Sequence, residues 1–236
     1  MPTPKLIITA DDYGMSPRFN QGIIEAVQAG LITGISIMIY RKYIRSKELL
    51  RTRLPLGLHL EIQDDAPYQE ITHQIERFKK RFGRLPDYLD GHQHKHITEK
   101  NIRRVARAAK QFGLPVRSRL PEDRMILTEI AVPTPENFVS WHPARLAVLK
   151  ERLQQTKKFS ISELVVHPGY RDKRCRYRYN NEREKELEFL CSPRFRKLIQ
   201  SFRLVGYNGL INPTADVRAA TRSTTRKRAA KKAIRA

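Results

Sequence analysis

Residues able to hold a metal ion or move a proton stand where apolar runs of this sequence end. Asp11 and Asp12 follow the apolar run of residues 6–8, and Gly14 and a Ser-Pro pair come next. A short, continuous apolar run is typical of a buried parallel strand, whose carboxyl end is where α/β folds place their chemistry. Adjacent carboxylates repel each other, and a bound cation would stabilise the pair. The alternative is that the pair only caps a helix starting near Pro17.

Three further predicted strands end in polar groups of this kind. His59 lies near the end of the strand at residues 56–60, Asp90 and His92 stand where the strand beginning at Asp87 runs into a loop, and His167 ends the strand that begins at Ser162. Any one of these histidines alone is more often a hydrogen-bonded core or rim residue than a ligand. Their joint occurrence with two carboxylates favours one shared site. Imidazole and carboxylate groups suit zinc, or a related divalent ion where oxygen ligands prevail.

The alternation of His92, His94 and His96 allows two interpretations. In an extended segment these three histidines and Asp90 share a face, so that up to three imidazoles converge. If the strand ends at His92, then His94 and His96 line a loop and contact substrate instead. For His96 we favour a third interpretation, a surface loop without a function.

Helical and strand patterns alternate along the chain. Strands are expected at residues 6–8, 35–40, 56–60, 87–90, 114–118, 162–167 and 206–211. Helices are expected at residues 17–29, 42–53, 71–82, 101–112, 143–156 and 182–202, the last with a break near Ser192-Pro193. Residues 120–142 contain three prolines and no clean periodicity, which suggests a long excursion at a barrel rim. The alternation predicts an α/β fold of parallel βαβ units, and about seven strands suit an irregular barrel better than an open sheet.

The charge of the chain is concentrated at its end. The formal net charge is +22, and the eight Lys and Arg from Arg218 onward face no acid, which leaves +14 for residues 1–217. We therefore expect a globular domain at residues 1–216 and a basic tail at residues 217–236 that is disordered when free. Such a tail can bind nucleic acid or an anionic membrane through nonspecific phosphate contacts, or it can be a solubilising extension.

Cellular location follows from absences in the sequence. Two cysteines give no disulfide framework, no run approaches the roughly 18 apolar residues of a membrane span, and no secretory signal is evident. The expected location is the cytoplasm. The oligomeric state is left open, with a homodimer as one option.

Four segments, in order, resemble the YdjC-like carbohydrate deacetylases: Ala10-Asp11-Asp12-Tyr13-Gly14, Gly57-Leu58-His59-Leu60, the segment from Asp90 to His96, and His167-Pro168-Gly169. Residues 22–26, 183–187 and Ser192-Pro193 resemble the first and last helices of that family. The resemblance covers about residues 5–212. It implies a divergent (β/α) barrel related to the polysaccharide deacetylases. It also implies one divalent metal ion, zinc or magnesium, and removal of N-acetyl groups from amino sugars such as chitooligosaccharides.

The resemblance also assigns roles to individual residues. The metal ligands would be Asp12, His59 and His92. Asp11 would be the general base that takes a proton from the attacking water, and His167 the general acid that protonates the leaving amine.

Three further residues are expected at the site. Arg117 resembles a family arginine that holds the base ionised, and His94 and Tyr13 are expected to contact substrate. The sequence departs from the family pattern where residues 61–67 lack the usual threonine and glycine, and where Gly91 replaces a serine. These departures concern substrate identity more than metal binding. Two alternatives stay open: a metal-dependent hydrolase of another amide or ester, and a nucleic-acid-binding protein with a vestigial site and a basic tail.

Overall fold

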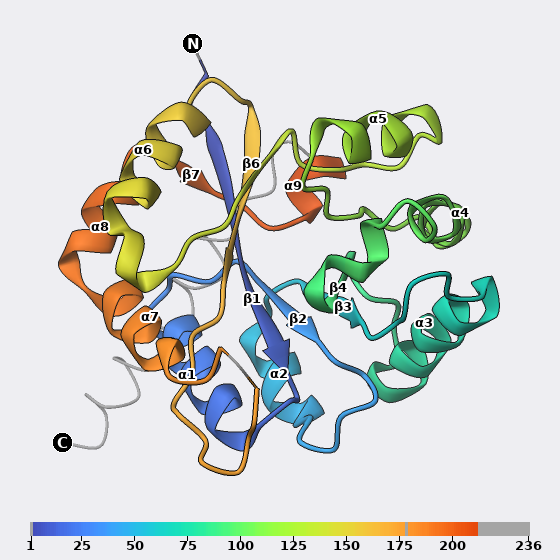
Figure 1. Cartoon of the computed structure of the whole chain (residues 1–236), viewed down its shortest axis with the longest axis horizontal. Helices are drawn as coiled ribbons and strands as arrows, with labels where there is room; N and C mark the ends of the chain where they lie inside the picture. Colours follow the sequence, from blue (N-terminus) through green and yellow to red (C-terminus); the bar gives the residue numbers. More distant parts are fainter. Residues whose placement is uncertain (1, 178, 212–236) are drawn as a thin grey trace, which may run out of the picture.

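A seven-stranded sheet forms the centre of the molecule (Figure 1). The computed structural model describes residues 2–177 and 179–211. Every strand pairing in this part of the chain is parallel. The hydrogen-bonded order is β4-β3-β2-β1-β6-β5, and β7 pairs with β1 as well. The strands are β1 Lys5–Tyr13, β2 Gly34–Ile37, β3 Leu56–Leu60, β4 Leu89–Gly91, β5 Asn137–Val139, β6 Ile161–Val166 and β7 Arg203–Leu204.

Strand β1 is the axis of the sheet. It pairs with β6 from Lys5 to Ala10, with β7 at Lys5 and Leu6, and with β2 from Thr9 onward. Every residue from Leu6 to Tyr13 is buried, because neighbours cover both sides of the strand. Since all strands run parallel, the carboxyl ends of β1, β3, β4 and β6 lie at the same edge of the sheet. The carboxylates and histidines that the sequence places at the ends of these strands therefore meet at that edge.

Helices surround the sheet, which curls into an incomplete, irregular (β/α) barrel (Figure 1). The helices are α1 Pro17–Gln28, α2 Ser46–Thr52, α3 Tyr68–Phe82, α4 Ile102–Phe112, α5 Pro121–Glu129, α6 Leu146–Thr156, α7 Glu182–Cys191, α8 Pro193–Ile199 and α9 Asn208–Ile211. Short 3₁₀ helices occur at His92–Ile97 and Pro143–Arg145. Ser16 caps α1 by accepting a hydrogen bond from the backbone N–H of Arg18, and Pro17 occupies the first turn, where a missing N–H costs nothing.

Three expectations about elements were wrong. Residues 120–142 are no featureless excursion, because they contain helix α5 and strand β5. Pro121 is at the first turn of α5, so it starts the helix rather than breaking it. The segment at 114–118 pairs through one isolated bridge, between Val116 and Leu89. The closing strand is β7, and residues 208–211 form α9 instead.

Two statements about the whole chain complete the fold. The predicted basic tail at residues 217–236 lies outside the described residues, as does the predicted domain boundary at 216. Among the helices of the described part, none has the length and apolar character needed to cross a membrane.

Candidate active site

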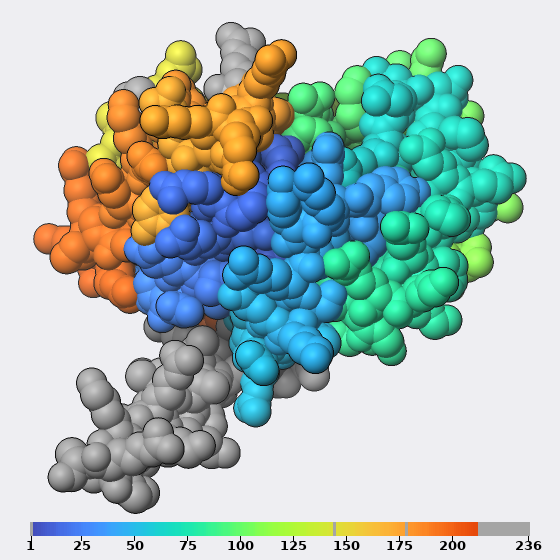
Figure 2. Space-filling view, turned by 90° about the horizontal axis from the view of Figure 1, so that it is seen from below, coloured from blue at the N-terminus to red at the C-terminus, as the bar shows by residue number. Residues whose placement is uncertain are grey.

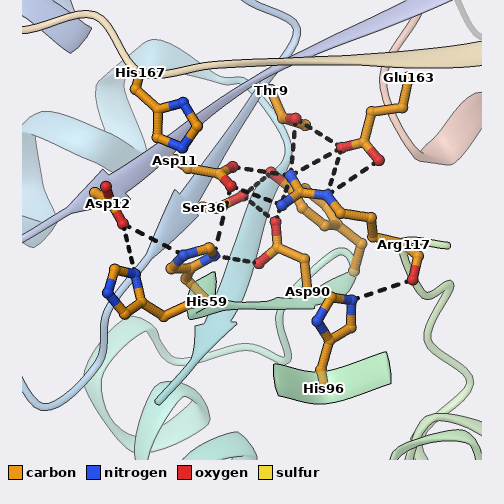
Figure 3. Close-up of polar contacts among 12 residues, drawn as sticks. Thr9, Asp11, Asp12, Ser36, His59, Asp90, His96, Arg117, Glu163 and His167 are labelled. Atoms are coloured by element: carbon orange, nitrogen blue, oxygen red, sulfur yellow. Dashed lines mark hydrogen bonds and ion pairs between the residues drawn. The ribbon is translucent and has the colours of Figure 1, made fainter. Parts of the chain in front are cut away.

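A bulge in β1 turns both of its adjacent carboxylates toward one site. Ala10 pairs with Ile35 and Tyr13 with Ile37, so Asp11 and Asp12 together oppose a single residue of β2. Asp12 has a left-handed backbone with φ of 69°. In a regular strand, neighbouring side chains point to opposite faces. The bulge removes that alternation, and both carboxylates are buried beside the same histidine (Figure 3).

Asp12 gathers two of the predicted histidines around it. His92 Nδ1 lies 3.1 Å from Asp12 Oδ1, and His59 Nε2 lies 3.4 Å from the same oxygen. The other carboxylate oxygen of Asp12 accepts a hydrogen bond from Arg183 of α7. The guanidinium of Arg183 is fully buried and stacks on Phe19, 3.9 Å from the ring centroid.

The donor atoms of Asp12, His59 and His92 fit a divalent metal ion. They lie within 4.8 Å of one another, and one carboxylate with two imidazoles is a common ligand set. His59 Nδ1 donates to Asp90 Oδ1 at 2.9 Å, which leaves Nε2 free on the side of Asp12. A carboxylate that fixes the tautomer of a ligating histidine in this way is typical of metal sites. Asp11, His59 and Asp90 also lie close together.

The charge of the site fits a cation as well. Four buried carboxylates, those of Asp11, Asp12, Asp90 and Glu163, face two buried guanidiniums, those of Arg117 and Arg183. Burial lowers the pKa of His59, but the carboxylates of Asp90 and Asp11 outweigh it and hold that pKa well above its ordinary value. An excess of negative charge that favours a proton on a buried imidazole also favours a metal ion there.

Arg117 holds the first carboxylate of the pair. Its Nη1 and Nη2 atoms donate to the two oxygens of Asp11 at 2.7 and 2.8 Å, in a bidentate pair (Figure 3). Burial alone would raise the pKa of Asp11, but Arg117 and His59 reverse the direction and lower that pKa below its ordinary range. Asp11 is therefore ionised at neutral pH, as a proton acceptor must be. Both oxygens of Asp11 already accept from Arg117, and the two oxygens of Asp90 are occupied by Arg117 with Ser36 and by His59. The set with Asp12 therefore suits a metal better than the set with Asp11.

His167 stands beside the two carboxylates, at the end of β6 (Figure 3). Its backbone N–H donates to Glu186 of α7 at 2.8 Å, and its ring meets the ring of Tyr179 edge-on. Burial lowers the pKa of His167 to about 4, although Asp12 and Asp11 act in the opposite direction. The imidazole is therefore neutral at pH 7 in the metal-free protein.

The histidines after His92 do not share a strand face. Residues His92–Ile97 form a 3₁₀ turn in which Gln93 and His94 have positive φ, so the extended interpretation is wrong. His96 is fully buried and its Nε2 donates to the backbone oxygen of Arg117 at 3.2 Å, so it is not part of a surface loop. Burial lowers the pKa of His94 to about 3, with Arg117 contributing. His94 is therefore a neutral ring at pH 7, edge-on to Phe138.

Tyr13 has its hydrogen bond with helix α2 and not with a residue of the candidate site. Its side chain is fully buried and its hydroxyl donates to Glu48 of α2 at 3.0 Å. The ring and the hydroxyl of Tyr13 both have partners inside the fold, and Tyr13 offers a substrate no exposed surface.

Sequence reasoning did not find two buried residues of the site. Arg183 comes from a helix of mixed charge, in which nothing marks one arginine as buried. Glu163 could have been noticed, because it is a charged residue inside the apolar strand β6. Of the residues that the sequence did predict for the site, all except Tyr13 lie at the carboxyl edge of the sheet.

The comparisons with known proteins identify the family. The family model of YdjC-like proteins matches residues 5–69 and 61–201. This chain belongs to the YdjC-like family. A protein from Vibrio cholerae named carbohydrate deacetylase is 25% identical, over 88% of this chain and 97% of its own length. A chitooligosaccharide deacetylase from Serratia marcescens is 26% identical, over 82% of this chain and 93% of its own.

Other similarities are partial or concern the fold. A mouse carbohydrate deacetylase is 28% identical, but the match spans only about half of either protein, 52% of each. A crystal structure from Enterococcus faecalis, named for cellobiose-phosphate cleavage, has a TM-score of 0.77 at 24% identity and covers 88% of this chain and 99% of its own. A peptidoglycan N-acetylglucosamine deacetylase has a TM-score of 0.53 at 12% identity, with 87% of both chains covered. The YdjC-like barrel is thus related in fold to polysaccharide deacetylases.

Proposed function

We propose that this YdjC-like protein is a hydrolase that removes N-acetyl groups from an amino-sugar oligosaccharide or glycoconjugate with the help of one divalent metal ion. The observation that carries the proposal is the pair of neighbouring carboxylates with different partners. Asp12 faces His59 and His92, whereas Asp11 is bound to Arg117. The names of the relatives, carbohydrate and chitooligosaccharide deacetylases, support the substrate class.

The residues divide the reaction between them. A divalent ion held by Asp12, His59 and His92 would polarise the acetyl carbonyl and make a water molecule more acidic. Asp11 accepts the proton of the attacking water, and its bidentate pair with Arg117 keeps it ionised and fixed in direction. His59 donates from Nδ1 to Asp90, so its Nε2 atom is the one directed at Asp12, where it would bind the ion in place of a proton.

His167 acts at the leaving group. It is neutral before the reaction, so it must gain a proton before it can protonate the amine. Asp11 is the source of that proton, because it holds the proton that it has taken from the attacking water. The side chains of Asp11 and His167 face the same space (Figure 3). His167 then delivers that proton to the amine nitrogen as the carbon–nitrogen bond breaks.

The choice of metal follows from the donor set only in part. Two imidazoles and one carboxylate favour zinc, while a site completed by several waters would accept magnesium. We keep both as candidates. The predicted cytoplasmic location, the homodimer and the nonspecific polyanion contact of the tail remain predictions.

One experiment tests the proposal. Purified protein is stripped of metal, reloaded with zinc or magnesium, and assayed for acetate release from N-acetylglucosamine oligomers, with acetyl esters of the same sugars in parallel. We expect acetate from the amides in the metal-loaded protein only. Acetate from esters alone would point to the ester hydrolase instead. If neither substrate is cleaved with either metal, the proposed function is wrong.

A further inference from the structure

Glu163 holds the second edge of the buried Arg117 guanidinium. Arg117 Nε lies 3.1 and 3.2 Å from the two oxygens of Glu163, and Nη2 lies 3.0 Å from Glu163 Oε1. The edge formed by Nη1 and Nη2 is the one that binds Asp11. The guanidinium is thus clamped between two carboxylates, one at the site and one farther inside the barrel (Figure 3). A planar fork held on both edges has a fixed orientation.

Glu163 is itself held by two hydroxyl groups. Thr9 Oγ1 donates to Glu163 Oε1 at 2.6 Å, and Tyr207 Oη donates to Glu163 Oε2 at 2.7 Å. Glu163, Tyr207 and Thr9 have no exposed surface. A buried carboxylate is costly unless such donors compensate it. Within the described part of the chain, the side-chain hydrogen bonds of Glu163 are those with Arg117 and with the two hydroxyls that hold its carboxylate in place.

A second series of contacts connects Tyr207 to Asp90 at the site. The ring of Tyr207 stacks on Tyr88 with centroids 4.0 Å apart and planes 9° apart. Tyr88 Oη lies 3.0 Å from Ser36 Oγ, and Ser36 donates to Asp90 at 2.6 Å. Asp90 closes the circuit by an ion pair with Arg117 at 2.7 Å, and it also orients His59. We call this set, Arg117, Glu163, Tyr207, Tyr88, Ser36 and Asp90, the inner ring.

Tyr207 enters the inner ring from a segment that the family model does not match. The match ends at residue 201, whereas Tyr207 follows β7, which pairs with the first residues of β1. Val205 and Tyr207, which follow β7, pack in one buried cluster with Ile7, Tyr88 and Ile161. The end of the described chain therefore contributes a buried hydroxyl to a network that reaches the catalytic carboxylate.

We propose that Glu163, held by Tyr207, is a positioning residue that aims the Arg117 guanidinium at Asp11. This inference rests on the proposed function, since it assigns to Glu163 a part in orienting the general base. Neither residue contacts Asp12, His59 or His92 in the recorded interactions, so the effect should fall on turnover and not on the metal. Without the Glu163 clamp, Arg117 can rotate, and Asp11 loses the fixed direction that proton transfer requires.

The test compares Glu163→Gln and Tyr207→Phe with the wild-type, metal-loaded protein. Tri-N-acetylchitotriose is the probe, and kcat, KM, metal content and melting temperature are measured together. We expect kcat to fall by about 10- to 100-fold in Glu163→Gln and by less in Tyr207→Phe, with KM within about twofold and metal content unchanged. Tyr170→Phe is the control, because Tyr170 also donates to a glutamate, Glu25, but outside the inner ring. It should keep the wild-type kcat.

A second readout does not depend on activity. Nitrogen-15 NMR follows hydrogen exchange at Arg117 Nε–H, assigned by its loss in Arg117→Lys. Slow exchange in the wild type that becomes fast in both ring variants supports the clamp. Unchanged kcat in both variants, or loss of metal in parallel with kcat, would overturn the positioning role. If the wild type releases no acetate at all, the proposed function fails, and the exchange at Arg117 alone decides whether Glu163 positions it.

Discussion

Asp11 and Asp12 are neighbours in sequence, yet the structure gives them separate partners. Arg117 binds both oxygens of Asp11, while Asp12 is shared between Arg183 and two imidazoles. Both oxygens of Asp11 are thus bound to one guanidinium, whereas Asp12 keeps one oxygen directed at the two imidazoles, where a metal ion would bind. The bulge in β1 makes this division possible, because without it the two side chains would point to opposite faces of the sheet.

The two carboxylates should therefore fail in different ways when each is changed to asparagine. Asp12→Asn weakens the metal site, so activity should fall and partly recover at high added metal. Asp11→Asn leaves the ligands in place but removes the proton acceptor, which typically costs about 10²–10⁴ in rate. Added metal should not restore it. Kinetics of both variants on an N-acetylglucosamine oligomer, titrated with metal, measure the difference. Metal rescue of Asp11→Asn but not of Asp12→Asn would reverse the two roles.

His167 gives the fold a dependence on pH that can be measured without a substrate. Its pKa is about 4 in the folded, metal-free protein and about 6.5 in the unfolded chain. The unfolded chain therefore binds more protons between these values, and stability falls as the pH drops from 6.5 toward 4. The difference of about 2.5 units corresponds to at most about 3 kcal/mol.

We expect His167→Asn to reduce this loss of stability. The free energy of unfolding, from urea titrations of metal-free protein between pH 6.5 and 4, should vary less with pH in the variant than in the wild type. His73→Asn is the control, because His73 is an exposed residue of α3. An equal dependence on pH in wild type and His167→Asn would mean that His167 is not the residue that resists protonation.

At the scale of elements, the sequence predicts strands better than it predicts the backbone between them. The apolar runs that lead to Asp11, His59 and His167 are strands β1, β3 and β6, because such runs are shorter than a typical helix and turn or polar residues follow them. The 3₁₀ turn at His92–Ile97 was not predictable, since positive φ at Gln93 and His94 leaves no signal in their residue types.

Very short strands and contacts between distant residues could not be predicted from local sequence patterns, for a different reason. Strand β5 has three residues, too few to show a period of two. Arg183 reaches Asp12 across 171 positions of sequence, and only packing of α7 against α1 brings them together. Packing of this kind is set by the assembled fold, so a local window cannot reveal it.

Helix α1 lies very close to the segment that follows β6, and this close approach leads to a prediction. A Cβ atom on Gly22 would lie 2.5 Å from the backbone Cα of Gly169, two residues after His167. Figure 2, seen from the end where β1 terminates, shows the orange segment around residue 170 against the blue residues of α1. Changing a glycine inside a helix to alanine normally raises the free energy of unfolding, by up to about 1 kcal/mol. Here the backbone clash should reverse that sign.

We therefore expect Gly22→Ala to lower the free energy of unfolding by about 1–3 kcal/mol and to reduce turnover by displacing His167. Gln21→Ala, at the neighbouring exposed position of the same helix, is the control and should change stability little. Urea unfolding and acetate release measure both effects. A stabilised Gly22→Ala would show that the two segments can separate without cost.

At the scale of the whole molecule, charge is distributed unevenly. Of the net charge of +22, eight positive charges come from residues 218–236 and none of them has an acidic neighbour in sequence. The remaining +14 belongs to residues 1–217, in which the buried groups of the site carry more carboxylates than guanidiniums. A substrate therefore meets a positively charged protein with a negatively charged centre, which is the arrangement that a bound cation completes.

Removing the chain after Asp216 separates these two sources of charge. The removed residues hold only two apolar residues larger than alanine, Val217 and Ile234, so they offer little surface for a core. The melting temperature and the turnover of small oligosaccharides should therefore change little. Binding to a polyanion such as double-stranded DNA should weaken and lose most of its dependence on salt, because each phosphate contact releases counterions. Fluorescence anisotropy at several salt concentrations measures the binding to the polyanion, and thermal unfolding measures the melting temperature.

A variant in which eight neutral residues replace the same lysines and arginines is the matched control, since it keeps the length of the chain. If truncation lowers the melting temperature strongly while charge removal does not, the tail packs on the barrel. If neither change affects polyanion binding, the positive charge of residues 1–217 is its source.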